Sequence, residues 1–385
     1  YIFVKNNYVN QLHEKIPSEN ITFLPFNEPS KLQKKIFEIL YGFYEISCFL
    51  TKSCPDQVVF YERLKHFNSK AWLFRICGHI IGKLISKKIK DIIFRILFKE
   101  KKYQCMNLDR VLITTYHTIY EWQVLASVKT KDIYFFTDGW DAFTKQTNYF
   151  IPLKKIFVWS EGMNVSAMKN CHLNDCEIIV SGNPFWGMLK SENVINKKIK
   201  VMAFDTNLNV YNLVQILRNI QNLDAKQEKF ELSIRCSPIC SPKYKKKYSE
   251  FRQFIKGENI FFSDDWGNRK LNLSKDTLIE NYNNQLNNHD IFIVFGPTTV
   301  IFDILHLKKP VIILEIKGDD DKKWDWTQSL QREVLDELKE NPLVKFSSSL
   351  SGLIGIMDEM TKSTKFDNVT LNNGAEHKIY QGLVN

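Results

Sequence analysis

Hydrophobic positions along the chain alternate between short apolar runs and longer amphipathic stretches. The apolar runs are rich in Val, Ile and Phe and end at Gly, Pro, Asp or Lys, which is typical of buried strands. We expect strands at 1–4, 110–115, 132–137, 155–159, 176–180, 200–204, 230–235, 259–262, 290–295, 311–314 and 344–346, and a short extended piece at 23–26. Apolar residues at helical spacing predict helices at 30–51, 69–102, 118–128, 161–171, 209–221, 243–256, 275–286, 300–307, 328–339 and 350–362. Alternating strands and helices predict an α/β fold with Rossmann-like parallel sheets covered on both faces.

The stretch 290–314 shows this alternation most clearly. An apolar run is broken by Gly296-Pro297-Thr298-Thr299, and a helical stretch and a second apolar run follow. A helix that begins at the carboxyl end of a parallel strand offers free N–H groups and a positive dipole end to an anion. Thr298 and Thr299 would add hydroxyl donors, and Asp303 could meet a ribose hydroxyl. The alternative is an ordinary strand–helix–strand unit capped by Thr, and this window alone leaves both interpretations open.

A polar stretch divides the chain into two predicted domains. Residues 183–199 are interrupted by Asn183, Pro184 and Gly187, and we interpret them as a hinge between domains at 1–182 and 200–362. A chain of 385 residues is long enough for both, and residues 363–385 form a polar tail. Two such domains would face a cleft, and ligands of parallel sheets bind at the carboxyl ends of the strands. The loops expected to reach the cleft are 137–144, 235–242 and 295–303.

The charge balance favours an anionic partner. Lys and Arg number 53 against 43 Asp and Glu, which gives a net charge of +10. Nucleotides, nucleic acid and acidic lipid all fit this balance. Because the basic residues gather in the helical stretch 69–102 and no recognised module appears, we do not expect nucleic-acid binding. This basic amphipathic stretch predicts either attachment to an anionic membrane surface or a core-facing helix with a solvated basic side.

The eight cysteines do not predict a disulfide framework or a zinc site. Cys171-x4-Cys176 and Cys236-x3-Cys240 lack the paired C-x2-C spacing that structural zinc favours. We expect reduced cysteines and therefore a cytoplasmic protein. No signal peptide is visible, and no apolar run is long enough to span a membrane.

Several motifs at the predicted strand ends resemble those of one enzyme family. In the first domain these are Asp138-Gly139-Trp140-Asp141-Ala142-Phe143-Thr144, Phe157-Val158-Trp159-Ser160-Glu161 and Val180-Ser181-Gly182-Asn183-Pro184-Phe185. In the second they are Arg235-x-x-Pro238, Gly296-Pro297-Thr298-Thr299 with Asp303, and Lys309-Pro310. Over residues 108–350 the chain resembles bacterial surface-polysaccharide glycosyltransferases of the GT-B fold, related to Kdo-, sialic-acid- and glycerophosphate-transferring families. It departs from them at Ser237, where the relatives often carry His, and at Asp303, where Glu is usual.

The resemblance implies metal-independent transfer of a sugar from a nucleotide-sugar donor to a growing cell-surface glycan, with no cofactor. The acceptor would be a glycan or glycolipid, and the enzyme would lie in the cytoplasm or peripherally on the inner membrane face. The donor-binding residues would be Arg235, Ser237, Pro238, Gly296, Pro297, Thr298, Thr299 and Asp303.

Carboxylates at the expected cleft edge of the first domain are the candidates for the base that activates the acceptor hydroxyl. Asp138 and Asp141 are the pair predicted there, although Asp before Gly is also a common turn element. His117 follows another strand at the same edge and is an alternative acid–base group or acceptor contact.

Other functions fit the same pattern. One alternative is a sugar-nucleotide epimerase or a transferase that uses CDP-glycerol. An epimerase would not need the basic amphipathic stretch, and we would expect more acid–base residues around its cleft. An alternative of another class is a non-catalytic glycan- or lipid-binding scaffold that keeps the fold.

Overall fold

A computed structural model describes the parts of the chain that carry the sheets. The described residues are 2–5, 22–26, 29–35, 106–114, 119–137, 139, 153–170, 176–192, 196, 198–204, 230–235, 260–262, 275–295, 298–314, 332–362, 378–379 and 381. The chain forms two compact units, and we describe each by itself. Unit 1 comprises residues 1–158, 166–179 and 382–385, and unit 2 comprises residues 159–165 and 180–381. The predicted basic helix 69–102 lies outside the described residues.

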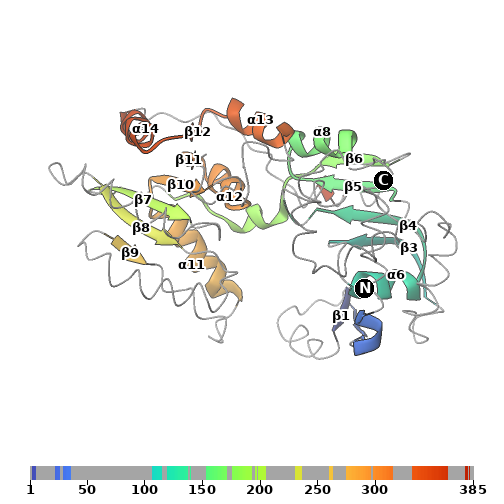
Figure 1. Ribbon diagram of the computed structural model, residues 1–385. Helices are drawn as coiled ribbons and strands as arrows, with labels where there is room; N and C mark the ends of the chain where they lie inside the picture. Colours follow the sequence, from blue (N-terminus) through green and yellow to red (C-terminus); the bar gives the residue numbers. More distant parts are fainter. Residues whose placement is uncertain are drawn as a thin grey trace, which may run out of the picture. The chain divides into compact units, whose positions relative to one another are not determined.

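Unit 1 contains a four-stranded sheet with the strands in chain order (Figure 1). The strands are β3 (Asn107–Ile113), β4 (Lys129–Phe136), β5 (Lys155–Val158) and β6 (Glu177–Val180). Helix α6 (Ile119–Ser127) leads from β3 to β4. Helix α8 (Glu161–Asn170) follows β5, and its residues up to Val165 belong to unit 2. The pairs β3–β4 and β4–β5 are parallel. Strands β1 (Ile2–Lys5) and β2 (Phe23–Phe26) form a separate parallel pair.

Strands β3 and β4 both begin three residues earlier than the hydrophobic pattern predicted. Apart from Leu108 the added residues are polar, and Asn107 pairs with Lys129 in the parallel ladder. Backbone pairing does not require apolar side chains, so a search for apolar runs finds only the buried part of each strand. That buried part holds the core, where Tyr134 and Phe157 meet edge to face with ring centroids 6.5 Å apart.

Unit 2 contains a six-stranded parallel sheet with the order β12-β11-β10-β7-β8-β9 (Figure 1). The strands are β7 (Ile199–Phe204), β8 (Phe230–Arg235), β9 (Ile260–Phe262), β10 (Ile291–Phe295), β11 (Val311–Leu314) and β12 (Val344–Ser347). When the strands are numbered within the unit and taken from β9 to β12, this is the order 3-2-1-4-5-6 of doubly wound nucleotide-binding folds. Strands β8 and β9 are added on one side of β7, and β10, β11 and β12 on the other. The pair β7 and β10, where the direction of strand addition reverses, is therefore the topological switch point.

Four helices described in unit 2 accompany these strands. They are α11 (Lys275–Asn287), α12 (Val300–His306), α13 (Arg332–Glu340) and α14 (Leu350–Lys362). Every residue of β11 is buried, as expected for a central parallel strand covered on both faces. The predicted α/β class with two Rossmann-like parallel sheets is therefore confirmed. The predicted helices 209–221 and 243–256 lie outside the described residues.

Part of the predicted hinge 183–199 packs within unit 2. The short 3-10 helix η3 (Pro184–Met188) is capped by Asn183, whose side chain accepts from the backbone N–H of Phe185 at 3.0 Å. The Asn283 side chain accepts from the N–H of Lys190, and that of Asn287 accepts from the N–H of Glu192, both at 2.9 Å. These two α11 residues hold the segment that follows η3. A hinge role for 183–199 stays a prediction.

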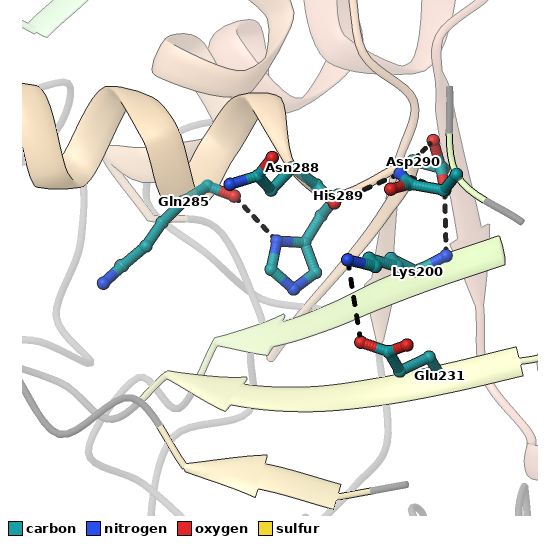
Figure 2. Close-up of polar contacts among 7 residues, drawn as sticks. Lys200, Glu231, Gln285, Asn288, His289 and Asp290 are labelled. Atoms are coloured by element: carbon teal, nitrogen blue, oxygen red, sulfur yellow. Dashed lines mark hydrogen bonds and ion pairs between the residues drawn. The ribbon is translucent and has the colours of Figure 1, made fainter. Parts of the chain in front are cut away.

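A polar network lies at the amino edge of the six-stranded sheet (Figure 2). The Asp290 carboxylate accepts from the Lys200 backbone N–H at 2.8 Å and from Asn196 Nδ2 at 3.0 and 3.1 Å. A ring nitrogen of His289, Nδ1, lies 2.7 Å from the Gln285 carbonyl oxygen, and Lys200 Nζ lies 3.8 Å from Glu231. Lys309 Nζ donates to the carbonyls of Asn287 and His289 at 2.6 and 2.7 Å. These bonds join the end of α11 to the starts of β7, β8, β10 and β11.

Candidate nucleotide-binding edge of the six-stranded sheet

The candidate site lies at the carboxyl end of the strands around the switch point. Val294 of β10, Phe204 of β7 and Arg235 of β8 are partners in one row across three adjacent strands. Neighbouring strands lie about 4.8 Å apart, so Arg235 is about 10 Å along this row from the strand that leads to Thr298. The strand order, which the sequence pattern does not contain, brings these two predicted donor-binding elements to one edge.

The guanidinium of Arg235 is held by two side chains of α11. Its central carbon lies 4.5 Å from the ring centroid of Tyr282 and 6.0 Å from that of Phe204. Nη1 of Arg235 donates to Oε1 of Gln285. Because Tyr282 and Gln285 are three residues apart on a helix, they lie on the same face and reach the guanidinium together.

Asp303 is a buried carboxylate at the centre of the same network. The residue is 6% exposed. Its Oδ2 accepts from the Tyr282 hydroxyl at 2.8 Å, and its Oδ1 accepts from Trp186 Nε1 at 3.0 Å. Burial raises the pKa of Asp303 to about 6, although both hydrogen bonds and the charge of Arg235 act in the opposite direction. Burial, followed by the nearby Asp303 charge, raises the pKa of Tyr282 well above its usual range.

Aromatic rings from η3 and α12 pack around this carboxylate. Trp186 stacks on His306 with centroids 5.6 Å apart, and Phe185 lies 6.1 Å from Tyr282. The Trp159 ring meets both Trp186 and Phe302 edge to face at 6.1 Å. Burial lowers the pKa of His306, whose Nδ1 is buried without a hydrogen-bond partner. The segment after β6, which includes η3, therefore packs against one side of Asp303 and contributes a hydrogen-bond donor to it.

The start of α12 shows that Thr299 does not act as a side-chain cap. Thr299 is the N-cap residue, but its hydroxyl makes no capping hydrogen bond. The helix closes instead through backbone bonds of 3.1 Å from Ile301 to Thr298 and from Phe302 to Thr299. Capping by the Thr299 hydroxyl, the ordinary explanation for this residue type at a helix start, is thus wrong. Ligand contact by the two hydroxyls stays a prediction.

The Trp159-Ser160 part of one family motif, which belongs to unit 2, contacts other residues of that unit. Trp159 packs on Trp186 and Phe302, as described above, and Ser160 Oγ donates to Glu337 of α13 at 2.6 Å. The same Glu337 oxygen accepts from the backbone N–H of Gly162 at 3.0 Å. The Glu337 carboxylate thereby accepts from one of the backbone N–H groups in the first turn of α8 that have no partner within the helix.

The structure brings together two of the predicted site residues, Arg235 and Asp303, and joins them through Tyr282. A ribose contact by Asp303 stays a prediction, and its described hydrogen-bond partners are protein side chains. The predicted residues outside the described part of the chain, whose roles also stay predictions, are His117, Asp138, Asp141, Ser237, Pro238, Gly296 and Pro297.

Sequence reasoning missed three members of the network: Trp186, Tyr282 and Gln285. Tyr282 and Gln285 lie in a helix whose pattern predicted only a packed face. Trp186 offered a weak signal, because a large aromatic residue is unusual in a stretch otherwise polar enough to be interpreted as a hinge. Their side chains bond to Arg235 or Asp303, which lie 21 to 117 positions away in the sequence, so no local pattern indicates these contacts.

The described residues contain neither a metal-ligand cluster nor a membrane-spanning helix. No group of three or more His, Cys, Asp and Glu side chains in the described part gathers as metal ligands would. Within that same part, no helix combines the length and apolarity needed to cross a membrane.

Comparison with known proteins gives structural matches only. Neither protein-family models nor curated protein sequences match the chain. UDP-GlcNAc 2-epimerase from Methanocaldococcus jannaschii, in complex with UDP-GlcNAc and UDP, is 17% identical over 77% of this chain and 80% of that chain, with a TM-score of 0.46. S. aureus MnaA with UDP is 11% identical over 78% of each chain, with a TM-score of 0.48. A glycosyltransferase from Rickettsia africae is 14% identical over 77% of this chain and 75% of that chain, with a TM-score of 0.40.

With identities this low and TM-scores below one half, these matches carry no weight for the class of protein. The class rests on the strand order instead. The chain is an α/β protein with two parallel-sheet units, the second of which has the doubly wound order of nucleotide-binding folds.

Proposed function

We propose that the chain is a glycosyltransferase that moves a sugar from a nucleotide-sugar donor to a growing cell-surface glycan. The observation that carries the proposal is the placement of Arg235 at the carboxyl end of β8, beside the switch point between β7 and β10. Ligands of doubly wound sheets bind at this position, and an arginine there suits phosphate groups because its planar fork matches them. Nucleotide binding is therefore the part of the proposal that the geometry supports best.

Sugar transfer enters the proposal from the motifs that resemble GT-B glycosyltransferases. In such a site the leaving diphosphate would be stabilised by Arg235 and by the turn that contains Thr298 and Thr299. Asp138 or Asp141 would accept the proton of the acceptor hydroxyl. No metal is required by this scheme, since protein cations and backbone N–H groups neutralise the leaving group.

Binding is the first test. Thermal-shift and calorimetric titrations with UDP-, GDP-, CMP-, CDP- and dTDP-linked ligands should identify one nucleotide that stabilises the protein. Arg235→Gln should weaken that binding by about 30-fold, because charge-assisted bonds to phosphate contribute about 2 kcal/mol. Stabilisation by none of these ligands would favour the non-catalytic scaffold.

Transfer is the second test. With the stabilising donor and a membrane-derived glycan acceptor, Asp138→Asn and Asp141→Asn should each leave nucleotide affinity unchanged, and one should lower the transfer rate by at least 100-fold. Full transfer by both variants would refute the base assignment. Conversion of the donor into an isomer without any acceptor would instead establish the epimerase alternative. Addition of EDTA should leave the transfer rate unchanged.

We also propose that the basic stretch 69–102 attaches the enzyme to an anionic membrane surface, where a glycolipid acceptor would lie. Lys83, Lys87, Lys88 and Lys90 are four of its basic residues within eight positions. Replacing these four with Gln should weaken co-sedimentation with phosphatidylglycerol vesicles by at least tenfold, since each basic residue contributes about 1 kcal/mol near such a surface. Equal binding by the variant and the wild type would refute the attachment.

A further inference from the structure

The contacts of Arg235 indicate that its side chain is oriented before any ligand arrives. Tyr282 presents its ring face 4.5 Å from the guanidinium carbon, and Gln285 accepts a hydrogen bond from Nη1. The ring restricts tilting of the guanidinium plane, and the amide oxygen restricts its rotation within that plane. Arginine otherwise loses much rotamer freedom when it binds an anion, so orienting it in advance strengthens binding.

Tyr282 is in turn fixed by a buried carboxylate. Its hydroxyl donates to Asp303 Oδ2 at 2.8 Å, and Asp303 Oδ1 accepts from Trp186 Nε1 at 3.0 Å. Moving the Tyr282 ring away from Arg235 would break a bond to a buried charged group, which is costly. The Phe185 ring, 6.1 Å from that of Tyr282, limits the space into which the ring could move.

We infer that Tyr282 and Gln285 are positioning residues that hold the Arg235 guanidinium ready for the phosphate groups of the bound nucleotide. This inference rests on the proposed nucleotide binding and adds to it the side chains that set its strength. The alternative is that Arg235 serves only as a counter-charge to Asp303, in which case changes at Tyr282 would alter stability and leave ligand affinity unchanged.

The test is calorimetric titration of the full chain with UDP, CDP and inorganic pyrophosphate at pH 8. Tyr282→Leu should weaken binding about tenfold because the ring under the guanidinium is lost. Tyr282→Phe keeps the ring and loses the bond to Asp303, so it should weaken binding much less, by about twofold. Gln285→Met keeps the side-chain length, removes the acceptor and should weaken binding about threefold. This last variant also tests the inference if Tyr282→Leu fails to fold.

A double-mutant cycle separates positioning from a general loss of structure. If Tyr282 acts through Arg235, Tyr282→Leu should have no further effect on affinity in an Arg235→Gln background. The matched control is Tyr134→Leu in unit 1, where a buried tyrosine likewise lies under a cation, with Lys155 Nζ 5.9 Å from its ring centroid. This control should leave affinity unchanged.

The outcomes distinguish this inference from the proposed function. If the wild type binds UDP, CDP or pyrophosphate and Arg235→Gln weakens that binding, nucleotide binding stands. If Tyr282→Leu and Gln285→Met then bind as well as the wild type, or if Tyr282→Leu has the same effect with and without Arg235, the positioning role is overturned. If the wild type binds none of the three probes and none of the other nucleotides tested by thermal shift, the nucleotide site and the positioning role fail together.

Discussion

The two edges of the six-stranded sheet carry polar networks of different kinds. At the amino edge, Asp290 and Lys309 bond mainly to backbone groups: the N–H of Lys200 and the carbonyls of Asn287 and His289. At the carboxyl edge, Arg235, Tyr282 and Asp303 are joined by contacts between side chains. Both networks involve α11, so they share one helix as their support.

We infer from this difference that the amino-edge network stabilises the fold, and that the carboxyl-edge network orients side chains. Bonds to backbone groups satisfy donors and acceptors where the chain enters a strand, and they are required for folding whatever the protein binds. Bonds between side chains fix the direction of charged and aromatic groups, and in a parallel sheet the carboxyl edge is where ligands are met. We therefore expect changes at the amino edge to affect stability and leave binding unchanged, and changes at the carboxyl edge to affect binding as well.

The largest effect should come from Asp290→Ala at the amino edge. The substitution removes the acceptor for the Lys200 N–H and for Asn196 Nδ2, and should lower the free energy of unfolding by about 3 kcal/mol. Urea denaturation measures this change, and calorimetry should show unchanged nucleotide affinity in the folded variant. A loss of affinity comparable with that of Arg235→Gln would contradict the division of roles between the edges.

The next effect concerns Asp303 and depends on pH. Because its pKa is raised to about 6 in the folded protein, folding favours the protonated form. This stabilisation is complete below about pH 4 and is lost as the pH rises through 6, a change of about 3 kcal/mol at about 1.4 kcal/mol per pKa unit. Asp303→Asn keeps an acceptor for Trp186 and does not titrate. Urea denaturation at pH 4.5 and 7.5 should therefore show the variant gaining about 2 kcal/mol of stability relative to the wild type at the higher pH. A constant difference would contradict the shift.

At the amino edge, His289 should respond to pH in the opposite direction. Burial lowers its pKa, and the hydrogen bond to Gln285 opposes the shift, so the folded state favours the neutral ring. The stabilisation is present above the unfolded pKa near 6.5 and is lost as the pH falls towards the folded value. His289→Asn can still donate to the Gln285 carbonyl, and should be less acid-sensitive than the wild type in thermal unfolding at pH 5. Equal acid sensitivity would show that another group titrates.

The smallest effect on stability should come from Thr299→Val. Since the hydroxyl makes no capping bond, its loss should change the free energy of unfolding by less than about 0.5 kcal/mol, where loss of a Thr cap costs about 1 kcal/mol. If the hydroxyl contacts the donor phosphate, nucleotide affinity should fall about fivefold in the same variant. Unchanged affinity would remove Thr299 from the site.

The sequence by itself determined the local elements and the fold class. Periodicity depends on neighbouring residues, so the strand at 290–295 and the helix that begins at Val300 could be predicted from their own side chains. The position of Arg235 at a strand end followed from the same reasoning. Strand starts were less accurate, because the mostly polar first residues of β3 and β4 are held by backbone pairing, which leaves no hydrophobic pattern in the sequence.

Only the tertiary structure decided which of these elements meet. The placement of β10 beside β7, rather than beside β9, makes the switch point, and no local pattern specifies that neighbour. Asp303 shows the same limit: from sequence it was a ribose contact at a helix start, and the structure gives it a partner 117 residues earlier in the chain. A buried carboxylate requires hydrogen-bond donors, but which donors reach it depends on how the helices and η3 pack.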